Sequence, residues 1–119
     1  MRPAFSLFFA SPAIRIVFAV LGLVRASSLF AHPEIEEALT RINSQIAAAP
    51  ADAMLYLERG ELYAKHEEWV SAEANYLRAA ELAPRNPQLA RARGALALAT
   101  GQAAEARGFF DAALRASPR

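Results

Sequence analysis

Two patterns of apolar residues divide the sequence. Near the N-terminus, apolar and small residues follow one another without a charge over 16–24. From residue 33 onwards, apolar residues are instead separated by polar ones at the spacing of an α-helix. Side chains three and four positions apart lie on one face of a helix, so this second pattern predicts amphipathic helices that share a core.

Local start and stop signals place the helices. The first three are expected over roughly 33–48, 53–66 and 69–82. Asp52 can cap the helix that follows it, and Asn86 with Pro87 can begin the fourth helix. Gly101 supplies a left-handed residue after that helix, and Pro118 lies beyond the last one. An all-α fold is therefore predicted.

The helical part of the sequence is a repeat. Five pairs of similar residues lie 34 positions apart: Gly60 and Gly94, Ala72 and Ala106, Tyr76 and Phe110, Ala79 and Ala113, and Pro84 and Pro118. Ala38, Ile42 and Pro50 match the first unit at the same distance and add half a unit before it. Such a period is typical of helical repeat arrays, which usually present a surface to another macromolecule.

Small residues at these positions predict close contact between paired helices. Gly60 is expected to face Ala72, and Gly94 to face Ala106, because a larger side chain would push the two helices apart. Large apolar residues should fill the space around these contacts, rather than serve a cofactor or ligand. They are Tyr56, Leu62, Tyr63, Trp69, Tyr76, Leu77, Leu82, Leu96, Phe110 and Leu114.

The stretch 56–63, followed by Trp69, Ala72, Tyr76, Ala79 and Pro84, resembles a tetratricopeptide repeat (TPR). The second unit is similar but weaker, because Ala90 and Ala97 stand where the family prefers large aromatic residues. The resemblance implies a short right-handed solenoid of antiparallel helix pairs, whose first helices line a concave groove for a peptide or partner helix. It divides the domain 32–119 into a half repeat (33–50) and two repeats (53–86 and 87–119).

Carried onto this sequence, the family pattern assigns the groove to the first helix of each repeat. Its expected contacts are Met54, Leu57, Glu61, Lys65, Gln88, Arg91 and Leu98, with Ala64, Ala95 and Ala99 between them. The chaperone-binding branch of the family grips a C-terminal carboxylate with basic and asparagine side chains, whereas Leu57 and Glu61 occupy matching places here. That specialised function is not expected. An alternative interpretation is that the alanines of this strip serve helix packing alone.

The N-terminal apolar run has the features of a secretory signal peptide, because Arg2 and Arg15 precede it and small residues follow. The run 16–24 is shorter than the roughly 20 residues that span a bilayer. Cleavage after Ala26 or Ala31 would release the helical domain, by export to the periplasm if the host is bacterial.

Arg25 directly after the run leaves an alternative, in which residues 16–24 stay as a membrane anchor. In that case the protein would contact the membrane through this segment alone. No cysteine is present, so neither disulfides nor a lipid-bearing N-terminal cysteine is expected.

Charge argues against a nucleic-acid partner. Without the three arginines of residues 1–31, the chain has 10 basic and 12 acidic residues. The charges are uneven, since residues 32–83 hold ten acids and four bases while residues 84–119 hold two acids and six bases. This polarity would suit either head-to-tail self-association or a partner of matching polarity, although ordinary solvated helix faces also produce it.

No catalytic or cofactor-binding motif is found, so neither an enzyme nor a metal site is expected. His66-Glu67-Glu68 lacks the second histidine that a zinc-binding helix needs. The leading hypothesis is an exported module that binds another protein or peptide. The alternative is a self-assembling subunit, or the front of a longer TPR scaffold, that uses the exposed last helix and its residues Phe109, Ala112 and Ala116.

Overall fold

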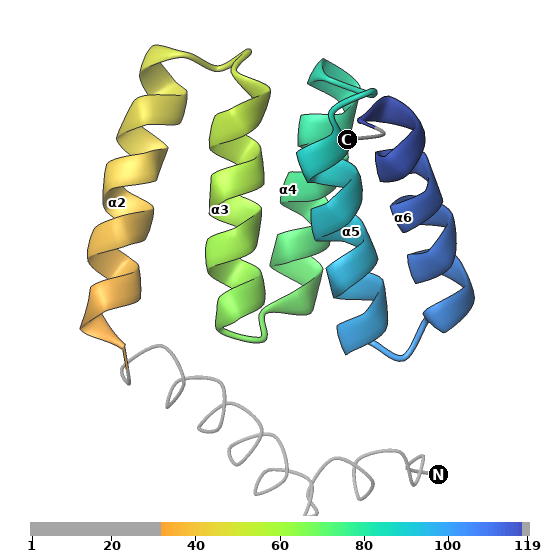
Figure 1. Cartoon of the computed structure of the whole chain (residues 1–119). Helices are drawn as coiled ribbons and strands as arrows, with labels where there is room; N and C mark the ends of the chain where they lie inside the picture. The colour runs from red at the N-terminus through yellow and green to blue at the C-terminus, as the bar shows by residue number, and fades with distance from the viewer. Residues whose placement is uncertain (1–31, 118–119) are drawn as a thin grey trace, which may run out of the picture. The chain divides into compact units, whose positions relative to one another are not determined.

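The computed structural model describes residues 32–117, so the predicted signal peptide and Pro118 lie outside the described residues. The described residues form five helices and no strand, which confirms the all-α prediction (Figure 1). The helices are α2 (Pro33–Ala48), α3 (Ala53–Lys65), α4 (Trp69–Leu82), α5 (Pro87–Ala99) and α6 (Ala103–Ala116). The chain divides into two units, Met1–Glu36 and Glu37–Arg119, and the packing described below is that of the second.

The two predicted helix caps are present. The Asp52 carboxylate accepts a hydrogen bond from the backbone N–H of Met54 at 3.0 Å. Asn86 accepts from the N–H groups of Gln88 and Leu89 at 2.9 and 3.4 Å, and Pro87 is the first residue of α5. Each cap satisfies backbone donors that have no partner inside the helix, and this fixes where α3 and α5 begin.

The corner within each helix pair is repeated at the same period of 34. The N–H of Glu68 donates to the carbonyl of Tyr63 at 3.0 Å, and the N–H of Gln102 donates to that of Ala97 at 2.7 Å. Gly101 has a φ of 79°, which is the predicted left-handed conformation. At the equivalent position of the first repeat, Glu67 has a φ of 61°. The first corner therefore holds a left-handed backbone without the glycine that usually relieves it.

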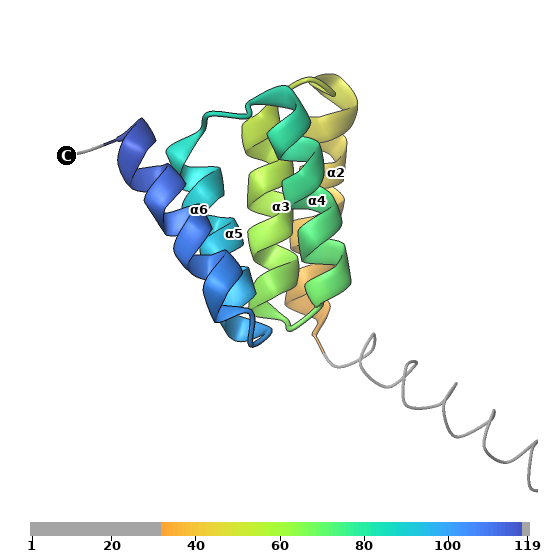
Figure 2. The same cartoon turned by 90° about the vertical axis from the view of Figure 1, so that its right-hand side faces the viewer.

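Helices α3 and α4 form one antiparallel pair, and α5 and α6 form the next (Figures 1 and 2). Between and within the pairs lies a core of small and large side chains: Leu57, Ala72, Tyr76, Ala79, Leu89 and Leu96. Alanines of the second repeat are buried as well, namely Ala97, Ala106 and Ala113. Apolar residues of α3, α4 and α5 therefore form one cluster across the boundary between the two helix pairs.

The paired glycines lie at close contacts between paired helices, and the atoms nearest to them are mainly aromatic. A Cβ atom at Gly60 would lie 2.6 Å from Cδ1 of Tyr76 and 3.2 Å from the carbonyl oxygen of Ala72. At Gly94 it would lie 2.7 Å from Cε1 of Phe110. The three atoms nearest to that Cβ all belong to the ring of Phe110, an aromatic neighbour of Gly94 that the sequence analysis did not assign to it.

Two residues predicted for the core are largely outside it. Leu77 is 47% exposed and Leu114 is 63% exposed. Each directly follows a buried residue, Tyr76 or Ala113, and one position along a helix turns a side chain by about 100°. That rotation carries both leucines away from the buried face.

One arginine in each repeat links three helices. Nε of Arg59 donates to Oδ1 of Asn75 on α4, and Nη1 donates to Oδ1 of Asn43 on α2, both at 2.7 Å. Asn75 is buried and also donates to the carbonyl of Ser71 at 2.8 Å. Charged donors make stronger hydrogen bonds than neutral ones, so Arg59 fixes α2 and α4 against α3.

Arg93 lies 34 positions after Arg59 and has the corresponding role. Nη2 of Arg93 is 3.1 Å from Oε1 of Glu73 on α4, and its guanidinium lies 4.4 Å from the ring centre of Phe109 on α6. Phe109 follows Arg93 by the same 16 positions that separate Asn75 from Arg59. The repeat therefore extends to the polar contacts that hold one helix pair on the preceding element.

Candidate binding groove

A hollow of about 620 Å³ lies between α3 and α5, the first helices of the two pairs. Its lining is Met54, Leu57, Glu58, Glu61, Gln88, Arg91 and Ala92. Five of the seven predicted groove contacts line this one hollow. Glu58 and Ala92 also line it and were not predicted.

A smaller hollow of about 220 Å³ adjoins the first along α3, on the side of α2. It is lined by Ala38, Arg41, Ile42, Glu58, Glu61, Leu62 and Lys65. Lys65 therefore lies near the groove but in the second hollow, whereas Leu98 lines neither and is exposed on α5. Glu58 and Glu61 line both, so the two hollows form one groove along α3.

Apolar side chains form the floor of the groove at the end nearest the start of α3. Leu57 is only 3% exposed, because it belongs to the core as well as to the groove lining. Met54 is half exposed, and its sulfur lies 3.2 Å from Nδ2 of Asn86, the residue that caps α5. Met54 is therefore an available contact, while Leu57 mainly shapes the floor.

The charges of the groove are not paired with one another. The ion pairs Arg78–Glu81 and Arg93–Glu73 do not involve any residue that lines the groove. Burial raises the pKa of Glu61 above its ordinary value, and the nearby charge of Glu58 raises it further. A carboxylate in this state gains from a cation brought by a ligand.

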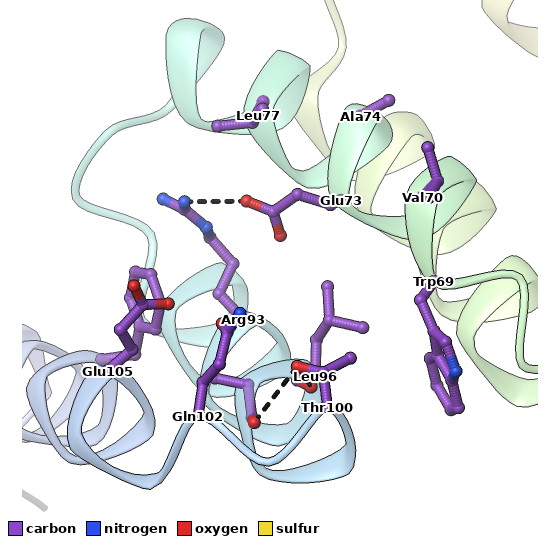
Figure 3. A pocket seen from close by; sticks show the side chains of 12 residues that line it. Trp69, Val70, Glu73, Ala74, Leu77, Arg93, Leu96, Thr100, Gln102 and Glu105 are labelled. Atoms are coloured by element: carbon purple, nitrogen blue, oxygen red, sulfur yellow. Dashed lines mark hydrogen bonds and ion pairs between the residues drawn. The ribbon is translucent and has the colours of Figure 1, made fainter.

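A second pocket, of about 460 Å³, lies among α4, α5 and α6 and was not predicted (Figure 3). Val70, Ala74 and Leu77 line it from α4, and the Arg93–Glu73 ion pair crosses it. Val70 is 86% exposed. The spacing 70, 74, 77 is a sequence signal for one apolar helix face, but a buried face gives the same signal.

The description of residues 32–117 also bears on metal and membrane sites. No three histidine or acidic side chains of that range come together as a metal site would require. Within the same range no helix combines the length and apolar content of a membrane span.

These features define an all-helical protein of two stacked antiparallel helix pairs, with a groove along the first helices. No protein-family model matches the chain, and no curated protein matches it either.

Proposed function

We propose that this chain is a TPR-type protein-interaction module that binds a peptide or helix of another protein in the groove along α3 and α5. One observation carries the proposal: equivalent positions of the two units line the same hollow. Met54 and Gln88, Leu57 and Arg91, and Glu58 and Ala92 are each separated by 34 residues. A repeat that brings equivalent side chains to one hollow builds a surface of the kind that repeat proteins use for partners.

The chemistry of the groove suits a peptide. Met54 and Leu57 give it an apolar part, and charged side chains from both helices, Glu58, Glu61 and Arg91, also line it. Apolar contacts supply affinity, and surrounding polar groups supply specificity and register.

The N-terminal sequence adds a proposal about where in the cell the protein acts. We propose that residues 1–31 direct export, to the periplasm in a bacterial host, where the partner would be another protein of the cell envelope. Retention of 16–24 as an anchor is the alternative. Intact-mass measurement on the exported protein tests both, because a chain that starts at Ser27 or His32 supports cleavage and a full-length mass supports anchoring.

Site-specific crosslinking tests the groove. A photoreactive residue at Gln88 or Arg91 should capture a partner in the cell, whereas the same residue at Arg107, an exposed position of α6 that lines neither hollow, should not. Equal capture at all three positions would contradict the proposal. Leu57→Glu is unsuitable for this purpose, because a charge at this buried position would disturb the core.

Self-association is a second candidate function, favoured by large apolar side chains exposed outside the groove. Of the large apolar side chains in the described range 32–117, Val70 on α4 and Leu114 on α6 are the most exposed. The last helix was predicted to leave Phe109 uncovered, but Phe109 is half-buried beneath the guanidinium of Arg93. Light scattering on Leu114→Glu therefore tests this candidate better than Phe109→Glu, with loss of an oligomer as the supporting result.

A further inference from the structure

Asn86 makes a second contact that its role as a helix cap does not require. Its Oδ1 accepts hydrogen bonds from the backbone N–H groups of Gln88 and Leu89, and these bonds begin α5. Its Nδ2 donates to Sδ of Met54 on α3 at 3.2 Å. Because the carbonyl oxygen has to face the two N–H groups, the orientation of the carboxamide is fixed and its NH2 group is left to face Met54.

The cap of α5 is an asparagine rather than an aspartate, and this difference has a physical consequence. The equivalent position of the first repeat is Asp52, which caps α3 by accepting from the N–H of Met54 at 3.0 Å. Asparagine and aspartate are about equally good caps, so capping alone would accept either residue at position 86. An ionised carboxylate has no donor, whereas a carboxamide has an NH2 group. Of the two residues, only asparagine can therefore cap α5 and also donate to the sulfur of Met54.

Met54 is the most exposed apolar side chain in the lining of the larger hollow. It is 43% exposed, whereas Leu57 is buried and Ala92 is half-buried. A methionine side chain has three rotatable bonds, so at an exposed position it takes many conformations unless a contact restricts it. The bond from Asn86 supplies such a contact, and it joins the start of α5 to the start of α3.

We infer that Asn86 is a positioning residue of the groove, which holds Met54 in one conformation for contact with an apolar side chain of a partner. The contact with a partner rests on the proposed function, whereas the positioning of Met54 does not. A ligand that meets an ordered side chain avoids the entropy cost of ordering it on binding. A thioether is a weak acceptor, so the bond acts on the position of Met54 more than on the stability of the fold.

The first test observes Met54 by NMR in the full chain, labelled with 13C at the methionine methyl groups. Met54→Leu assigns the Met54 signal by removing it. Asn86→Asp and Asn86→Ser keep an acceptor for the α5 cap but lack the NH2 group. In both variants the Met54 methyl signal should move toward its position in the urea-unfolded chain, while circular dichroism keeps the helical spectrum. An unchanged methyl signal in both variants would overturn the inference.

The second test measures the consequence for binding, with peptides selected from a random 12-residue display library on the full chain. Asn86→Ser adds no charge, and it should weaken the enriched peptides about three- to tenfold, as expected for the cost of ordering one flexible side chain. In the Met54→Leu background the same change should have no further effect, because the side chain on which Asn86 acts is gone. Equal weakening in both backgrounds would overturn the inference, since Asn86 would then act without Met54.

The outcomes separate this inference from the proposed function. Peptides that bind Asn86→Ser as tightly as the unchanged protein would overturn the inference and leave the groove as a peptide site. A library that enriches no peptide would contradict the proposed function, and the methyl signal of Met54 would then decide by itself whether Asn86 positions that side chain.

Discussion

Gly60 is the position where the stacking of helices in this protein can be tested most directly. The substitution Gly60→Ala adds one methyl group at the contact between α3 and α4. That methyl would lie 2.6 Å from Cδ1 of Tyr76 and 3.2 Å from the carbonyl oxygen of Ala72. Carbon atoms in favourable contact are about 3.5–4.0 Å apart, so either the ring or the helix must move.

The expected cost follows from two opposing terms. Alanine favours a helix over glycine by about 1 kcal/mol, whereas an extra methyl group in a packed core costs about 1–3 kcal/mol. Tyr76 is 2% exposed and the second contact is with backbone, so the neighbours have little room and the upper part of that range applies. We expect Gly60→Ala to lower the free energy of unfolding by about 1–2 kcal/mol.

Gly108 provides the matched control, because it lies within α6 and a Cβ there would meet nothing within 4 Å. Gly108→Ala should stabilise the protein by about 0.5–1 kcal/mol through helix propensity alone. A difference of about 2 kcal/mol between the two variants corresponds to roughly 8–16 °C in Tm for a domain of this size. Thermal unfolding followed by circular dichroism measures it. If Gly60→Ala raised the Tm as much as Gly108→Ala, the close contact at Tyr76 would be refuted.

Three further substitutions test the cap, the polar link and the groove charge. Asn86→Ala should cost about 1 kcal/mol in denaturant unfolding, because two N–H groups of α5 lose their acceptor. Asn75→Ala should cost about 1–3 kcal/mol in the same assay, since Arg59 loses a partly buried acceptor, and an unchanged midpoint would contradict this role. Glu61→Gln should raise stability at pH 7 by about 0.3 kcal/mol, a value kept small by solvent exposure. The pKa of Glu61 is raised in the folded state, so ionisation of Glu61 lowers the free energy of unfolding as the pH rises above 4.5. A series of Tm measurements against pH should show this contribution in the unchanged protein and lack it in Glu61→Gln.

The helix boundaries could be predicted because local groups determine them. Asp52 and Asn86 satisfy N–H groups within three residues of themselves, and Gly101 takes a left-handed conformation at the end of its own helix. The predicted helix 53–66 was too long by one residue only, since α3 ends at Lys65. The period of 34 likewise identified Gly60 and Gly94 as contact points from the sequence alone.

Contacts between helices distant in sequence could not be predicted in the same way. The period indicated that Leu57 belongs to the groove side of α3, but its burial depends on how closely α5 approaches. The apolar pocket at Val70 depends on the separation of α4 and α6, which no local signal encodes. Arg59 and Arg93 are conspicuous as a pair at the repeat distance, yet their partners Asn43 and Glu73 lie on the preceding element.

The charged residues of α3 have two different environments: Arg59 contacts the neighbouring helices, and Glu58 and Glu61 line the groove. Arg59 directs its guanidinium to Asn75 and Asn43, and these contacts fix the helix on both sides. Glu58 precedes Arg59 by one position and therefore points about 100° away, into the groove, where Glu61 joins it without an ion pair. Changing Arg59 should therefore disturb the fold that builds the groove, whereas changing Glu58 or Glu61 leaves that fold intact. Under the proposed function, the identity of the partner can thus change through these two carboxylates while the packing of the helices stays the same.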